Sequence, residues 1–139
     1  MFVSRNAVEN LSGDWSDFAL VSISEPNAVG LGKIDDKAFK FSSFYHFHDV
    51  EPGRNDDDEF IVEMDARHAL SMVSFLAQIE PEVEGILVNC RAGISRSAAV
   101  AKWICESRGL PFNQAYGQFN RHVFKLLKEA EESWKRSNA

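Results

Sequence analysis

The sequence predicts an α/β fold, in which one compact domain over residues 1–139 holds a central, mostly parallel sheet flanked by helices. Short apolar runs typical of strands alternate along the chain with helical repeats of apolar residues, and this alternation is the pattern of α/β proteins. Glycines and prolines fall between these segments, where turns belong. The length of 139 residues, 45% of them hydrophobic, suits one domain. We therefore expect a single domain with a single site.

The first half of the chain is expected to hold two strands and one long helix. The apolar run Phe18–Ser24 and the aromatic-rich residues 39–47 predict strands. A loop with a short helix is expected between them. Apolar residues recur at helical spacing from Ala66, with Asp65 as a suitable cap and Pro81 beyond the end. These features predict a helix between Asp65 and Pro81.

The second half is expected to alternate in the same way. Residues 85–88 are a short apolar run of the kind found in buried parallel strands, and residues 95–107 predict a helix stopped by Gly109 and Pro111. Only a tight loop separates this strand from this helix. Near the C-terminus, a single helical stripe predicts an amphipathic last helix. The stripe consists of Val123, Leu127, Ala130 and Trp134.

Charge and cysteine content exclude several classes of function. A net charge of −6 opposes binding to nucleic acid or to anionic membranes, since both attract basic surfaces. No apolar run approaches the roughly 20 residues of a membrane helix, and the first residues lack the apolar core of a signal peptide. Cys90 and Cys105, the two cysteines, predict free thiols in a reducing compartment. We expect a cytoplasmic protein without nucleic-acid or membrane partners, and the oligomeric state stays open.

The loop between the predicted strand at 85–88 and the following helix carries reactive residues. Cys90 lies at the end of the strand and Arg96 at the start of the helix, where loop N–H groups and the helix dipole favour an anion. The same field favours a thiolate, so Cys90 is a candidate nucleophile. Arg96 can grip two phosphate oxygens, Gly93 allows a tight turn, and Ser97 can donate to the sulfur. The expected phosphate-binding residues are Arg91, Ala92, Gly93, Ile94, Ser95 and Arg96.

This segment, Cys90-Arg-Ala-Gly-Ile-Ser-Arg96-Ser97, resembles the Cys-x5-Arg-Ser/Thr phosphate loop of the protein tyrosine phosphatase superfamily. The resemblance runs from about Phe18 to the C-terminus. The loop lies two-thirds of the way along a short chain, and in this respect the sequence is similar to those of the compact dual-specificity phosphatases. The resemblance implies hydrolysis of phosphate monoesters through a cysteinyl-phosphate intermediate, without metal or cofactor. It implies phosphotyrosine in proteins or peptides as substrate, with phosphoserine and phosphothreonine as further substrates.

The resemblance also implies an upstream aspartate that protonates the leaving oxygen as general acid. Asp49, which follows a predicted strand, lies in a segment where many relatives carry this residue. The acidic run Asp56-Asp57-Asp58 lies closer to Cys90, and the spacing usual in the family falls on Asp58. A cluster of acids is more often a solvated loop, so we favour Asp49 and keep the run as the alternative.

Two further positions leave alternatives open. Where the family usually has histidine before the cysteine, this chain has Asn89, which can keep hydrogen bonds but not charge. Asn89 is therefore expected to reduce the thiolate fraction, and a phosphate-binding pseudophosphatase module without turnover is the second hypothesis. Hydrolysis of phosphoinositides or RNA 5′-phosphates ranks last, because Arg91 is the only extra base in the loop. Asn120 lies where some members of the resembled family place a polar residue near the attacking water, and an N-cap of the last helix explains it as well.

The remaining candidates are expected to be structural. His46 and His48 alternate with aromatic residues along a predicted strand and belong to no evident set of three metal ligands, so they are assigned to the core or to a pocket rim. Cys105 lies on the helix after the loop and is expected to pack in the core.

Overall fold

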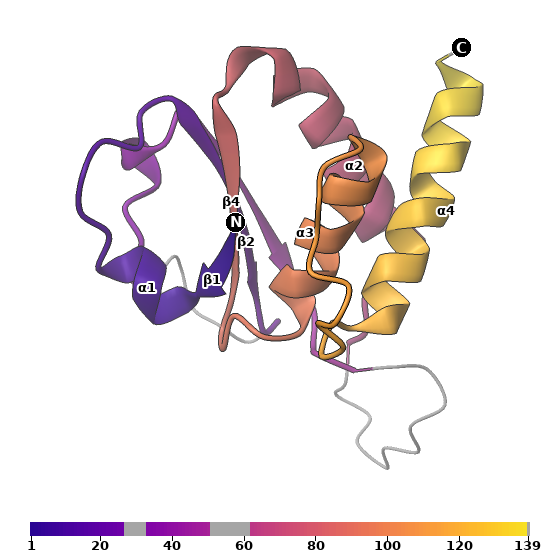
Figure 1. The fold of residues 1–139 in the computed structure, drawn as a ribbon, viewed down its shortest axis with the longest axis horizontal. Coiled ribbons are helices and arrows are strands. Elements are labelled where there is room, and N and C mark those ends of the chain that lie inside the picture. Colours follow the sequence, from indigo (N-terminus) through magenta and orange to yellow (C-terminus); the bar gives the residue numbers. More distant parts are fainter. Residues whose placement is uncertain (27–32, 51–61, 139) are drawn as a thin grey trace.

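The computed structural model describes residues 1–26, 33–50 and 62–138. Its centre is a four-stranded sheet in the order β1-β4-β2-β3, and each neighbouring pair of strands is parallel. Helices flank this sheet (Figure 1). The predicted α/β fold with a parallel sheet is therefore confirmed. The strands are β1 (Phe2–Ser4), β2 (Phe18–Ser24), β3 (Phe41–His46) and β4 (Gly85–Cys90).

The helices are divided unequally between the two faces of the sheet (Figure 1). Helices α2 (Ala66–Ile79) and α3 (Arg96–Ser107) lie on one side, and α4 (Arg121–Ser137) packs against both of them. The other side carries the short helix α1 (Arg5–Glu9) and the 3₁₀ helix η1 (Asp36–Ala38). A second 3₁₀ helix, η2 (Glu80–Glu82), follows α2.

Strands β2 and β4 are the central strands because their sequences are apolar on both faces. Along β2, Ala19, Val21 and Ile23 enter the core under α2, α3 and α4. Leu20 faces the smaller core on the opposite side, together with Leu87 of β4. The sheet therefore separates two apolar cores and holds β4 between β1 and β2.

The long helices begin where the sequence places caps. Asp65 accepts hydrogen bonds from the backbone N–H groups of Arg67 and His68, and the His68 ring accepts one from the N–H of Asp65 in return. This capping box fixes the start of α2. The helix ends at Ile79, and Pro81 lies in η2, as expected of a residue that cannot continue the helix.

Other expected boundaries differ from the observed ones by small amounts. The strand expected over residues 39–47 is shorter, and β4 runs two residues past the expected 85–88, so that Cys90 is itself its last residue. Helix α3 begins at Arg96, with Ser95 as its N-cap.

Strand β1 and helix α1 were not predicted from the sequence. A three-residue strand is too short to show an alternation of apolar and polar residues, and β1 exists because it pairs with the end of β4.

Within the described residues, none of the helices is long and apolar enough to cross a membrane.

Candidate active site

The candidate site lies at the carboxyl end of the sheet, where β4 ends and α3 begins. Cys90 is the last residue of β4 and Arg96 is the first of α3, so the connecting loop holds only residues 91–95. In parallel sheets the carboxyl ends of neighbouring strands meet at one edge. Residues that follow β2 and β3 therefore reach the same loop.

The Cys90 side chain is buried, and its Sγ lies 3.1 Å from Ser97 Oγ. Burial opposes the charged form, but hydrogen bonds from the Ser97 hydroxyl and from the backbone N–H groups of Ser97 and Gly93 outweigh it. Together with the charge of Arg96, they hold the pKa of Cys90 below its ordinary value. The surroundings of the sulfur therefore favour the thiolate form of Cys90.

Arg96 is also buried, at 4% exposure, and protein groups fix its guanidinium. Nη1 donates to the backbone carbonyl of Phe47 at 2.8 Å, and Nη2 donates to Glu25 Oε1 at 2.9 Å. Nε is buried and has no hydrogen-bond partner in the described part of the chain. A buried donor of this kind is costly unless a ligand satisfies it, and a phosphate oxygen is the matching acceptor.

Glu25 is a residue of this site that the sequence analysis did not single out. Burial raises the pKa of its carboxyl, but the paired Arg96 and, more weakly, Arg91 overcome that effect and leave the pKa below its ordinary value. Glu25 directly follows β2, at the same edge of the sheet as Cys90. That placement was a usable signal, because groups at the ends of adjacent parallel strands converge.

Gly93 lets the loop pack tightly against β1. Its φ is +71°, in the left-handed region, and a Cβ built on it would lie 2.4 Å from the Ser4 nitrogen and 2.5 Å from the Val3 carbonyl carbon. The backbone N–H of Arg5 donates to the Arg91 carbonyl at 3.2 Å. Only glycine fits a position with both constraints. The backbone of β1 thus packs directly against the loop.

The segment between α3 and α4 supports the loop from another side. The Tyr116 hydroxyl donates to the Ile94 carbonyl, and the Asn120 backbone N–H donates to the Ser95 carbonyl at 3.1 Å. The ring of Tyr116 packs edge-on against Phe2. Burial and the nearby Cys90 raise the pKa of the Tyr116 phenol. Sequence reasoning did not single out Tyr116, since nothing in its local pattern distinguishes it.

Asp49 is brought directly to the loop. Its Oδ1 accepts hydrogen bonds from Ser95 Oγ and from Asn120 Nδ2, each at 2.8 Å. Asn120 also caps α4, because its Oδ1 accepts from the Val123 N–H at 3.0 Å. The competing candidates, Asp56, Asp57 and Asp58, lie outside the described residues.

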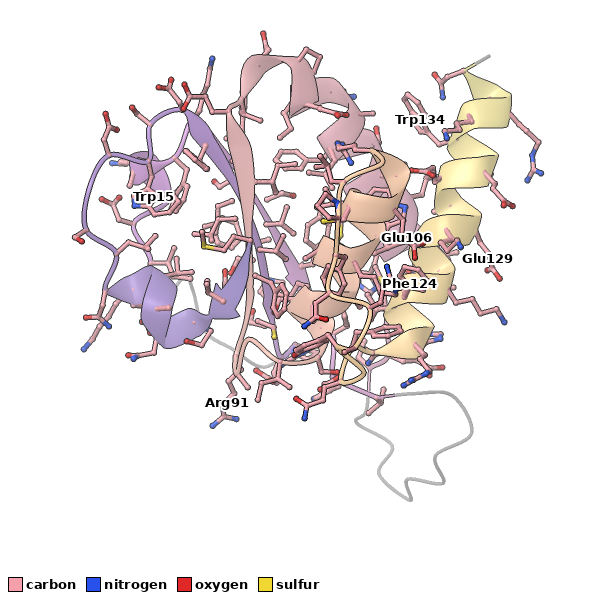
Figure 2. The ribbon with its side chains drawn as sticks, viewed as in Figure 1. Trp15, Arg91, Glu106, Phe124, Glu129 and Trp134 are labelled. Carbon is pink, nitrogen blue, oxygen red and sulfur yellow. The ribbon has the colours of Figure 1, made fainter. Side chains whose placement is uncertain are left out.

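The other loop residues are more exposed. Arg91 and Ala92 are exposed, as is Ile94 at 45%. Figure 2 shows Arg91 projecting from the rim of the molecule, away from the helices.

His46, His48 and Cys105 make their described contacts away from the loop. His46 Nδ1 lies 3.0 Å from Ser24 Oγ, and His48 Nδ1 accepts from the Val62 N–H at 2.9 Å. Cys105 is on α3, partly exposed rather than in the core as expected, and lines a hollow of about 420 Å³ beside β4. Among the described residues, no group of three potential metal ligands comes together.

Asn89 lies on the opposite face of the sheet from Cys90. Side chains alternate along a strand, and the neighbours Leu87 and Cys90 belong to the two different cores. Asn89 is 1% exposed, and neither its oxygen nor its nitrogen has a hydrogen-bond partner among the described residues. Asparagine at this position therefore supplies no side-chain bond to the loop.

No protein-family model matches the chain, and no curated protein matches its sequence. Among solved structures, the fold is similar to that of Tk-PTP in its active form, with a TM-score of 0.55 and 16% identity over 94% of this chain and 87% of that one. It is also similar to a human tyrosine phosphatase-like serine/threonine/tyrosine-interacting protein, with a TM-score of 0.54 and 19% identity over 86% of this chain and 80% of that one. The chain has the fold of tyrosine and dual-specificity-like phosphatases, as its sequence predicted.

Proposed function

We propose that this protein is a cysteine-dependent phosphatase that hydrolyses phosphate monoesters, with phosphotyrosine in proteins or peptides as the main substrate. The observation that supports this proposal most strongly is that two buried groups lie together at one loop. Cys90 has a lowered pKa, and Arg96 presents a buried Nε without a partner. A nucleophile and an oxyanion binder at a helix N-terminus are what attack on phosphorus requires.

In the first step, the Cys90 thiolate attacks phosphorus, so that a P–S bond forms while the P–O bond to the leaving group breaks. Asp49 gives its proton to the leaving oxygen. The N–H groups of residues 91–96 and the Arg96 guanidinium hold the three phosphoryl oxygens as charge spreads over them. Glu25 and the Phe47 carbonyl keep the guanidinium in place.

In the second step, water attacks the phosphorus of the cysteinyl-phosphate and the P–S bond breaks. Asp49, now a carboxylate, takes a proton from that water. Ser97 Oγ donates to the departing sulfur, which makes the thiolate a better leaving group. The protein is regenerated, and the products are an alcohol or phenol and inorganic phosphate.

The second candidate function is a phosphate-binding module without turnover. Asn89, in the position where the resembled family usually has histidine, is the observation that favours it. One similar structure is described as a tyrosine phosphatase-like interacting protein, which fits the same reading. Phosphoinositide or RNA 5′-phosphate hydrolysis has no comparable support, since Arg91 is the only additional base in the loop.

Hydrolysis of a small aryl phosphate by the full chain in the presence of chelator tests the proposal. Turnover should persist in chelator, because the thiolate and Arg96 do the work of a metal pair. Cys90→Ser should abolish turnover while phosphate binding survives. Unchanged activity in that variant would overturn the mechanism. Phosphopeptide binding by a wild-type protein that never hydrolyses would instead establish the binding module.

A further inference from the structure

Asp49, Ser95 and Asn120 form a hydrogen-bonded cluster beside the candidate loop. They come from the segment after β3, from the last loop residue before α3, and from the cap of α4. Both donors bind the same carboxylate oxygen, Asp49 Oδ1, at 2.8 Å. Three segments far apart in sequence therefore meet at one oxygen atom.

The Asn120 amide is fully used and can adopt only one orientation. Its Oδ1 accepts from the Val123 N–H at 3.0 Å, while its Nδ2 donates to Asp49 Oδ1 and, at 3.1 Å, to the Val50 carbonyl. A flipped amide would turn its two N–H groups toward the Val123 N–H and lose all three bonds. At 2% exposure, Asn120 has no room to respond by turning to solvent.

The arrangement distinguishes the two oxygens of Asp49. Oδ1 accepts both hydrogen bonds, so the proton of the neutral acid belongs on Oδ2. Asp49 itself is exposed, which leaves Oδ2 accessible to a leaving group. Ser95 connects this carboxyl to the loop that would hold the phosphate, because Ser95 is the residue before Arg96.

We propose that Asn120 and Ser95 are positioning residues that hold Asp49 beside the phosphate loop as a general acid with its proton on Oδ2. This rests on the proposed function. Catalysis is sensitive to such placement, since a displacement of about 1 Å can cost roughly 10²-fold in rate. The Asn120 side chain thus both caps α4 and orients the acid.

The competing interpretation is that the cluster only ties α4 to the loop, with Asp49 as a passive acceptor. The two interpretations separate on substrates with different leaving groups. A general acid matters for phenyl phosphate, whose leaving group needs a proton, and much less for a nitro-activated aryl phosphate. A structural tie would affect both substrates equally.

The main variant is Asn120→Ser, which keeps a cap for α4 but removes the amide donor to Asp49. Its kcat/KM on phenyl phosphate, which does not include the later attack of water on the cysteinyl-phosphate, should fall about 10- to 100-fold, with less than about a threefold change on the nitro-activated substrate. Ser95→Ala should act in the same direction, and it leaves the cap of α4 intact. Asn113→Ser makes the same substitution on the same segment and should be silent, because among the described residues the Asn113 side chain bonds only the N–H of Ala115 in its own turn.

The decisive measurement adds Asn120→Ser to Asp49→Asn. Asparagine at position 49 keeps an oxygen for both donors but has no acidic proton, so the second change should cost little more on phenyl phosphate. An equal loss of kcat/KM on both substrates, or full additivity of the two changes in kcat/KM, would overturn the positioning role while leaving the phosphatase intact. A wild-type protein without any turnover would overturn the phosphatase and, with it, the acid.

Discussion

Cys90 lies in surroundings that favour its charged form although the side chain is buried. Burial alone would raise the pKa of a thiol, so the lowering must come from groups that stabilise the thiolate. The Ser97 hydroxyl, 3.1 Å from the sulfur, is the largest of them. The reactivity of Cys90 therefore depends on the side chain of the second residue of α3.

Ser97→Ala should move the pKa of Cys90 back toward its ordinary value. A group with a depressed pKa is charged at lower pH, so the loss of Ser97 should shift the pH dependence of iodoacetamide alkylation at Cys90 toward higher pH. Mass spectrometry of the alkylated protein follows both cysteines separately. Cys105, away from the loop, serves as the internal control and should keep its profile. An unchanged alkylation profile of Cys90 would mean that Ser97 does not lower the pKa of Cys90.

Asn89 is a buried amide without partners in the described part of the chain, on the face of the sheet away from the thiol. Asn89→Leu replaces it by an apolar group of similar size, which should raise the free energy of unfolding by about 1–2 kcal/mol in urea denaturation. Because Leu at this position would face the other core, the alkylation profile of Cys90 should stay the same. Asn89→Asp, which buries an unpaired charge, should destabilise instead. Loss of stability in Asn89→Leu would indicate a hydrogen-bond role for this amide.

At the level of elements, the phosphate loop depends on its contact with β1. Gly93 combines a left-handed backbone with a close approach to the backbone of Val3 and Ser4. Neither constraint can be relieved by a side-chain rotation, since the atoms met are backbone atoms. A strand of three residues thus determines which residue the loop can hold.

Gly93→Ala should destabilise the fold by roughly 1–3 kcal/mol or more, and weaken phosphate binding as the loop shifts. Two controls separate the causes. Gly109 also has a left-handed φ, of +67°, but open space around it, so Gly109→Ala isolates the backbone cost. Gly117→Ala, with neither constraint, should be neutral. Thermal unfolding measures all three, and equal effects at positions 93 and 109 would mean that the contact with β1 is unimportant.

The elements differ in how far the sequence predicts them. Strand β4, the loop and helix α3 are contiguous, so their apolar run, glycine and capping residues can be read from one segment. The side chains that contact each other across the site cannot be predicted in this way, because they are distant in sequence. Glu25 lies 71 residues from Arg96, and Asn120 lies 71 residues from Asp49. No local pattern marks such pairs. The choice between Asp49 and the run at 56–58 stays a prediction, since that run lies outside the described residues.

At the scale of the whole molecule, parallel topology gathers the site from segments spread along most of the chain. Cys90 ends β4, Glu25 follows β2, and the Phe47 carbonyl follows β3, while Arg96 begins α3. Cys90 and Arg96 are close in sequence, but Glu25 and Phe47 are distant from them, so an unfolded chain does not hold these groups together. An anion bound between them therefore binds the folded state and not the unfolded one.

Inorganic phosphate should for that reason stabilise the whole fold against heat. At a concentration about 100 times its Kd, phosphate should add about 2.7 kcal/mol to the free energy of unfolding. For a chain of this size that amounts to a rise in Tm of roughly 10 °C. Scanning calorimetry measures the shift, with sodium chloride at equal ionic strength as the reference.

The variants decide where the phosphate sits. Cys90→Ser should keep most of the shift, because the loop N–H groups and Arg96 remain. Arg96→Lys keeps the charge but loses the planar fork, with its Nε–H and its bonds to Glu25 and Phe47, so most of the shift should disappear. If Arg96→Lys were stabilised as strongly as the wild type, phosphate would be binding elsewhere, and the buried guanidinium would be a structural ion pair with Glu25 only.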